Sequence, residues 1–326
     1  MDTAPAHSNE PVTLPVPAMP RDTRFDVTPY VPDGGFSAVG LIVLLLGLAV
    51  AGVIMGVVCH YVSKWFYMIV VFPMVIGFVI GGVGSVLVKT GKVRAPWLAG
   101  VAGLLAGILA MTTTHYLDYR EFANLIQENK FNVHKGAIFA PKEENALAKK
   151  MLKVKSFADY IDFAAEQGVS IKRAAGGNDK GMNLGYYGTY IYWLVETLIV
   201  AGIVFTMTRK PAQEPFCPLT NEWKTERCGD NFMVPQELGL DAVAEALKNG
   251  ELGKIAEVKS LGAASPESSI PTRLYIYASP QHSEQCTLDV RLNKFVPGKN
   301  GAVEEKQMVM ATYPAAALGA FVTLCG

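Results

Sequence analysis

Glu196 is the residue whose position in this chain most suggests chemistry, because it is a carboxyl group inside an apolar segment. The surrounding residues 189–207 read TYIYWLVETLIVAGIVFTM, and a helical period places Tyr192, Trp193 and Glu196 on one face. A carboxyl group in hydrocarbon is costly, so this face should be buried, with the acid protonated or paired. One interpretation is a proton or cation site with Tyr192 as hydrogen-bond partner. The alternative, an acid that fixes helix packing, is favoured because proton relays usually need several groups.

Two histidines lie at the ends of other apolar segments, in the membrane leaflet that we expect to contain Glu196. His60 lies near the end of the first segment, and His115 follows the third. Imidazoles from two helices could ligate haem or, together with Glu196, a divalent metal. No HExxH or similar ligand motif accompanies them, and histidines at a membrane interface are commonly hydrogen-bonded anchors. We therefore expect no cofactor.

The cysteines suggest a second metal site. Cys217 and Cys228 bracket a segment that resembles one half of a zinc ribbon, but the second thiolate of a CxxC knuckle is missing. With Cys286 and His282 these cysteines could supply four tetrahedral ligands, although the spacing matches no standard pattern. Free buried thiols are the favoured interpretation, and a persistent disulfide is not expected in a cytoplasmic module.

Other functional motifs are missing from the sequence. There is no phosphate-binding loop of the Walker type, no GxSxG elbow and no catalytic carboxylate pair, so we do not expect an enzyme. The 29 basic residues balance 29 acidic ones, which gives no net field to attract nucleic acid.

Four apolar segments must position these residues. They span residues 36–62, 66–88, 96–114 and 189–208, and each is long enough to cross a hydrocarbon core of about 30 Å as a helix. The chain as a whole is 50% hydrophobic and 18% charged, with a mean hydropathy of +0.24. The sequence therefore predicts a multi-pass protein of the plasma membrane, in contact with the lipid bilayer.

Charged residues beside these segments predict the orientation. Lys89, Lys92 and Arg94 follow the second segment, and Arg209 and Lys210 follow the fourth. Short basic loops usually face the cytoplasm, so both termini are expected there. The long connection before the fourth segment would face outward, because long loops cross the membrane largely regardless of their charge.

Three regions outside the apolar segments complete the domain organisation. Residues 1–35 contain seven prolines and predict a disordered tail. Residues 116–188 predict an outward-facing helical loop region, with helices near 142–152 and 157–167. Residues 209–326 predict a cytoplasmic α+β module. Its expected elements are helices at 236–247 and 251–259, a linker at 262–271, and antiparallel strands beginning near residues 273, 286 and 306.

Glycines in the apolar segments predict where helices touch. In lipid, helix association depends on close backbone approach at small residues spaced as GxxxG. We expect such contact faces in the first three segments, including one between the second and third. The glycines concerned are Gly52, Gly56, Gly77, Gly81, Gly84, Gly100, Gly103 and Gly107.

The expected fold class is membrane α-helical: a four-helix transmembrane bundle with an extracytoplasmic helical loop region and a small C-terminal cytoplasmic α+β module. The favoured function is a non-enzymatic interaction, assembly or sensing component, whose partners are other membrane protein subunits or a second copy of the chain. One alternative is a small ion- or proton-coupled transport protein that uses Glu196. The other is a membrane protein or enzyme that binds metal or haem.

Overall fold

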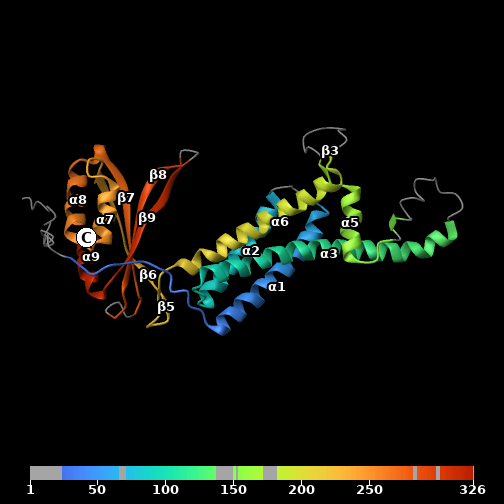
Figure 1. Ribbon diagram of the computed structural model, residues 1–326, viewed down its shortest axis with the longest axis horizontal. Coiled ribbons are helices and arrows are strands. Elements are labelled where there is room, and N and C mark those ends of the chain that lie inside the picture. The colour runs from blue at the N-terminus through green and yellow to red at the C-terminus, as the bar shows by residue number, and fades with distance from the viewer. Residues whose placement is uncertain are drawn as a thin grey trace, which may run out of the picture. The chain divides into compact units, whose positions relative to one another are not determined.

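The computed structural model describes residues 24–65, 71–136, 150–151, 153–171, 182–281, 285–298 and 302–325. The chain divides into two compact units (Figure 1). One unit is Pro32–Glu214, and the other combines Met1–Val31 with Pro215–Gly326. They are described in turn as the helical unit and the module.

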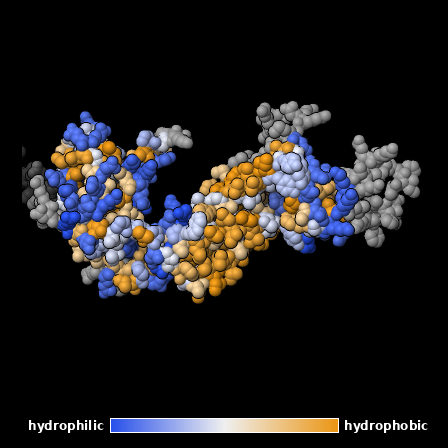
Figure 2. Space-filling model, in the orientation of Figure 1, coloured by the Kyte–Doolittle hydropathy of each residue, from blue (hydrophilic) through white to orange (hydrophobic). Residues whose placement is uncertain are grey.

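Four long helices form most of the helical unit: α1 (Ala38–Ser63), α2 (Val71–Thr90), α3 (Pro96–Gly136) and α6 (Gly185–Arg209). By length and composition, all four could cross a membrane. Figure 2 shows a broad apolar surface over this unit, as expected where side chains face lipid. These findings indicate a membrane-embedded protein.

Helix α6 packs against both α2 and α3, whereas α1 packs mainly against α3 and also against α2. The shared core is apolar, and its fully buried side chains include Leu44, Ile80, Val200 and Val204. Ser85 of α2 also donates a hydrogen bond to the Met207 carbonyl, 2.9 Å away, so a polar contact joins α2 to α6.

Helix α3 is much longer than its apolar part, and its extension carries a small helical layer. Helix α5 (Phe157–Gln167) begins with a capping box between Ser156 and Asp159. Tyr160 and its neighbours on α5 form an aromatic cluster with Tyr119 and other rings of the α3 extension. A two-stranded ribbon, β2 (Ser170–Ile171) and β3 (Met182–Asn183), then leads into α6. Most of the helix expected at 142–152 lies outside the described residues.

The module contains an antiparallel sheet in the order β1-β9-β8-β7-β6. Its strands are β1 (Thr28–Pro29), β6 (Thr225–Pro235), β7 (Ser269–Ala278), β8 (Leu288–Pro297) and β9 (Val303–Tyr313). A separate hairpin of β4 (Phe216–Cys217) and β5 (Glu222–Trp223) precedes β6.

One face of the sheet is covered by three helices: α7 (Leu240–Lys248), α8 (Leu252–Ala264) and α9 (Leu318–Cys325). Leu247, Ile276, Leu292 and Phe321 are almost completely buried between helices and sheet, because strand residues alternate between an apolar and a polar face. The apolar C-terminal stretch therefore packs in this core.

The structure differs from the sequence prediction in three places. The chain from Arg24 onward is not a disordered tail, because β1 pairs with β9 and Phe25 N donates to Gly250 O over 3.1 Å. Strand β6 was not predicted at all. The expected linker at 262–271 is instead the end of α8 and the start of β7.

Candidate functional site

Glu196 lies on the buried side of α6 and is only 3% exposed. Tyr192, one turn earlier, donates a hydrogen bond to its carboxylate, which is the pairing expected from the helical spacing. Helix α6 carries Glu196 into the bundle because the same face is apolar farther along, where Val200 and Val204 are completely buried. The acid therefore faces protein rather than lipid.

His60, near the end of α1, is also buried and is held by two carboxylates of α3. Its Nδ1 lies 2.6 Å from Asp118 Oδ1, and its Nε2 lies 3.5 Å from Glu121 Oε2. Lys64 Nζ contacts the same Glu121 oxygen at 2.6 Å. The result is an ionic network that joins α1 to α3 and reaches the exposed side chains of Lys64 and Glu121.

Sequence reasoning missed Asp118 and Glu121, although a signal for them existed. Both acids follow the third apolar segment, at the end of the bundle where His60 lies near the end of the first. Groups at the same membrane boundary on neighbouring helices can meet, but the register between α1 and α3 decides whether they do. That register depends on packing between distant segments.

His115 occupies a position between this network and α6. Its ring lies 5.1 Å from the Trp193 ring, and its Nδ1 lies 3.9 Å from Asp118 Oδ2. Its Nε2 is buried and has no hydrogen-bond partner in the described part of the chain. The contact with Trp193 places His115 about one helical turn from Glu196 along α6.

Cys59 is the neighbour of His60 on α1, and its thiol is buried in the bundle. Thr114 donates to the Gly56 carbonyl over 3.1 Å, which fixes α1 against α3 at this level. We name the residues Lys64, Glu121, Asp118, His60, Cys59, His115, Tyr192 and Glu196 the ionisable line.

The ionisable line enters the bundle from one end only. Beyond Glu196, toward the far end of α6, the core consists of apolar side chains such as Leu44, Leu48 and Ile80. Buried Thr208 in that half donates its hydroxyl to the Val204 carbonyl of its own helix. Among the described residues, no second row of ionisable side chains continues through that half of the core.

The sequence also suggested that His60, His115 and Glu196 could bind metal or haem. The structure brings all three to the same end of the bundle, but His60 pairs with Asp118. In the part of the chain that the structure describes, no group of three or more His, Cys, Asp or Glu side chains is placed to hold a metal ion.

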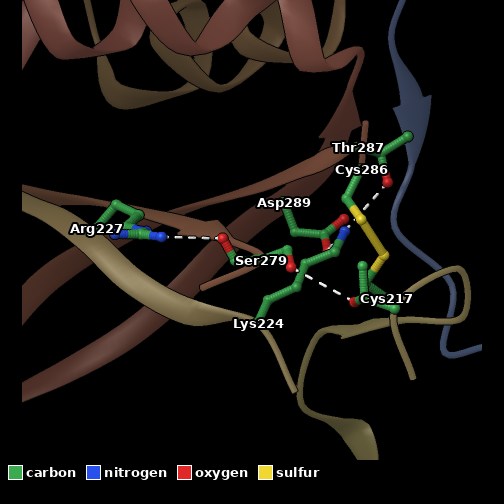
Figure 3. Close-up of a disulfide and its surroundings, with 8 residues drawn as sticks. Cys217, Lys224, Arg227, Ser279, Cys286, Thr287 and Asp289 are labelled. Carbon is green, nitrogen blue, oxygen red and sulfur yellow. Dashed lines mark hydrogen bonds and ion pairs between the residues drawn. A yellow bond between two sulfur atoms is a disulfide. The ribbon is translucent and has the colours of Figure 1, made fainter. Parts of the chain in front are cut away.

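The cysteines of the module form two disulfides, Cys217–Cys286 and Cys228–Cys325. The expected four-ligand site is therefore wrong, because a thiol in a disulfide cannot act as a thiolate ligand. His282, its fourth member, lies outside the described residues. The bonded cysteines are separated by 69 and 97 residues, so only the tertiary fold could reveal the pairing. The Cys217–Cys286 bond fastens the β4–β5 hairpin to the strand entering β8 (Figure 3).

A buried ion pair lies next to this disulfide. Lys224 Nζ is 2.5 Å from Asp289 Oδ2, and both side chains are at most 3% exposed (Figure 3). Thr312 donates to the other Asp289 oxygen over 2.7 Å, while Lys224 also contacts Thr287. Burial raises the pKa of Asp289, although Lys224 opposes that shift. The pair joins Lys224, between β5 and β6, to β8, and Thr312 adds a bond from β9.

The sheet face opposite the helices carries stacked arginine and tyrosine side chains. The Arg291 guanidinium lies 4.6 Å from the Tyr275 ring centroid, and that of Arg273 lies 4.7 Å from it. Tyr275 donates to both oxygens of Glu305, at 3.0 and 2.7 Å. Burial and this carboxylate raise the pKa of Tyr275 to about 12. We name Arg273, Tyr275, Tyr277, Arg291 and Glu305 the open sheet face.

All the glycines expected to mediate packing contact another helix, but not in the expected pairs. A Cβ on Gly52 or Gly56 of α1 would meet α3. In α2, Gly77 and Gly81 contact α6, and Gly84 contacts both Thr208 of α6 and Leu48 of α1. In α3, Gly100, Gly103 and Gly107 also contact α6. The expected contact between α2 and α3 glycines is thus replaced by contacts of each helix with α6.

Comparison with known proteins adds no family to this description. No protein-family model, curated protein or solved structure matches the chain.

Proposed function

We propose that this chain is a polytopic membrane protein that acts as a sensing and assembly component rather than as an enzyme. The observation that carries this proposal is the position of the buried ionisable groups. His60 lies on α1 and Glu196 on α6. These two helices are also the ones that the chain joins to the module, through residues 30–37 before α1 and residues 210–215 after α6.

A conformational change at a buried site can reach a domain at the end of a rigid helix. This requires that the helix has two packing arrangements and that the change at the site favours one of them. A change at Glu196 alters α6, whose C-terminal end leads into β4. A change at His60 alters α1, whose N-terminal end follows β1. Both routes lead to the module, which we propose is the part that reports the sensed state.

The open sheet face supports an interaction role for the module. Arginine and tyrosine are enriched at protein interfaces and among the residues that contribute most to binding. Here they stand on the sheet face that α7, α8 and α9 leave uncovered. Other membrane protein subunits or a second copy of the chain are the proposed partners.

Proton- or ion-coupled transport through Glu196 is the second candidate. It gains from the ionisable line, because a relay needs several groups and the structure supplies Asp118, Glu121 and His60 at the end of the bundle that also contains His115. A transporter also needs a path from the binding site to the opposite side of the membrane. The apolar core beyond Glu196 favours sensing over transport.

The orientation of the chain is part of this proposal. Basic residues of the short loops place both termini in the cytoplasm, yet disulfides persist mainly in oxidising compartments outside it. The two disulfides of the module support the opposite orientation, with the module on the non-cytoplasmic side. Residues 116–188 then face the cytoplasm, and their eleven lysines and arginines carry little weight for either orientation, because the charge rule applies to short loops.

Hydrogen exchange on the purified full-length protein tests the sensing role. Glu196→Gln is expected to change the exchange of backbone amides in β1 and in the β4–β5 hairpin, because α1 and α6 lead to these strands. Thr206→Val, at an exposed position of the same helix, is the control and should leave both unchanged. If Glu196→Gln alters only amides of the helical unit, the coupling to the module is refuted.

A further inference from the structure

We propose that the ionisable line is a proton-binding site, filled from the end of the bundle that carries α5, and that the proton is the ligand that the protein senses. The inference rests on the proposed sensing role and names its ligand.

The line is exposed at one end and buried at the other, which gives a route between water and the buried acid. The side chains of Lys64, Glu121 and Asp118 are 41%, 48% and 36% exposed, and that of His115 is 21% exposed. His60, Cys59 and Glu196 are buried. Protons exchange along such a row of donors and acceptors, whereas larger solutes need an open passage.

The groups around Glu196 favour a proton over a metal cation. The Tyr192 hydroxyl donates a hydrogen bond to it, and the His115 ring of α3 contacts the neighbouring Trp193. Residues 71–88 of α2 contain no ionisable side chain. Hard cations need several oxygen ligands, and the described residues hold no group of three or more His, Cys, Asp or Glu side chains placed for a metal ion, whereas one carboxyl group is enough to bind a proton.

The same network explains how proton binding could change the helices. His60 lies between Asp118 and Glu121, so the bonds of its ring join α1 to two acids of α3. Lys64 shares Glu121 with it, and Tyr160 of α5 packs against Tyr119 and Phe122 on the same stretch of α3. A change in charge along the line therefore changes the contact between α1 and α3.

The test is a pH titration of the purified full-length protein by infrared spectroscopy, which detects the carbonyl stretch of a protonated carboxylic acid. Wild type is expected to show such a band in the membrane-embedded region, and the band should decrease as the pH rises. Glu196→Gln should remove it, whereas Glu196→Asp should retain it with a shifted midpoint. Glu166→Gln, at an exposed acid of α5 that pairs with Lys150, is the control and should leave it unchanged.

Trp193 fluorescence gives a second, independent measurement of proton binding to the ionisable line, because the Trp193 ring lies against His115. In a variant whose other tryptophans are replaced by phenylalanine, Trp193 fluorescence should titrate with pH, and His60→Gln should shift that midpoint. The proposal is overturned if the infrared band is the same in wild type and Glu196→Gln across the pH range where both stay folded. A proton-dependent band without any change in the module would keep the site and refute only the sensing role.

Discussion

The role of His60 is ambiguous in the sequence and becomes clear only from the residues of α3 that contact it. In the sequence it is a histidine at a membrane boundary. In the structure it is a buried imidazole between Asp118 and Glu121, 2.6 and 3.5 Å away. The two acids define the contacts of its ring. His60 therefore belongs to an ionic contact between helices.

Residue-scale prediction from the sequence succeeded where partners are close along one helix. The spacing of four residues sufficed to pair Tyr192 with Glu196, and the structure has this hydrogen bond. It did not reveal the partners of His60 or the disulfide partners of Cys217 and Cys228, because those residues come from other elements. Local geometry is set by the helix, whereas distant pairing is set by the packing.

At the open sheet face, Glu305 predicts a dependence of stability on pH. The Tyr275 hydroxyl, then Asn293 and Arg273, lower the pKa of its carboxyl group. A lowered folded-state pKa stabilises the fold above the unfolded value of about 4.3, and this contribution is lost as the pH falls through the folded value. Glu305→Gln should therefore destabilise the module at neutral pH and lose this effect in acid.

Hydrogen exchange of the β7–β9 amides, compared between wild type and variant at each pH, measures this difference. Glu304→Gln, at the exposed neighbouring position, is the matched control. A penalty for Glu305→Gln that stays constant from neutral pH into acid would contradict the explanation, because it would not depend on ionisation.

At the element scale, α6 organises the helical unit because small residues of α2 and α3 both face it. Thr208 fits between Gly84 of α2 and Gly103 of α3, and Ala201 lies against Gly107. The sequence predicted that these glycines mark contact faces but could not say which helix meets which. Spacing identifies a face, whereas pairing depends on the fold of all four helices.

Leucine substitutions in α3 and α6 test this packing. A Cβ on Gly107 would lie 2.7 Å from Ala201 Cα, so Gly107→Leu must force the two backbones apart. We expect a loss of about 1–3 kcal/mol, the usual cost of overpacking. Gly202→Leu is the matched control, because no atom lies within 4 Å of a Cβ there and the substitution should be nearly neutral.

Unfolding of the purified protein in mixed detergent micelles measures both variants under the same conditions. Equal stability of Gly107→Leu and wild type would show that the close contact of α3 with α6 does not stabilise the bundle. A large loss for Gly202→Leu would show instead that its surface packs on something other than lipid.

The strands of the module also show that local sequence patterns do not reveal every pairing between distant segments. Alternating apolar residues predicted β7, β8 and β9, but β6 was obscured by the cysteine pattern, which suggested a metal-binding segment. Strand β1 is only two residues long and lies in a proline-rich stretch, so its pairing with β9 could not be inferred locally. Both missed strands are at the edges of the sheet, where the hydrophobic pattern is weakest.

At the scale of the whole molecule, the chain combines a helical unit suited to a membrane with a separately packed α+β module. Composition and apolar length were enough to predict the membrane part. They were not enough to predict the orientation, because the charges of the short loops and the disulfides of the module indicate opposite orientations. The disulfides decide the proposal, since the structure pairs four of the five cysteines and only Cys59 is free.

Labelling of single cysteines in intact cells tests this central claim most directly. In a Cys59→Ala background, Lys92→Cys marks the α2–α3 turn and Lys155→Cys marks the segment before α5. With the module on the non-cytoplasmic side, a membrane-impermeant maleimide should modify position 92 in intact cells and position 155 only after the membrane is opened. Modification of position 155 in intact cells, with position 92 protected, would contradict the proposed orientation and place the module in the cytoplasm.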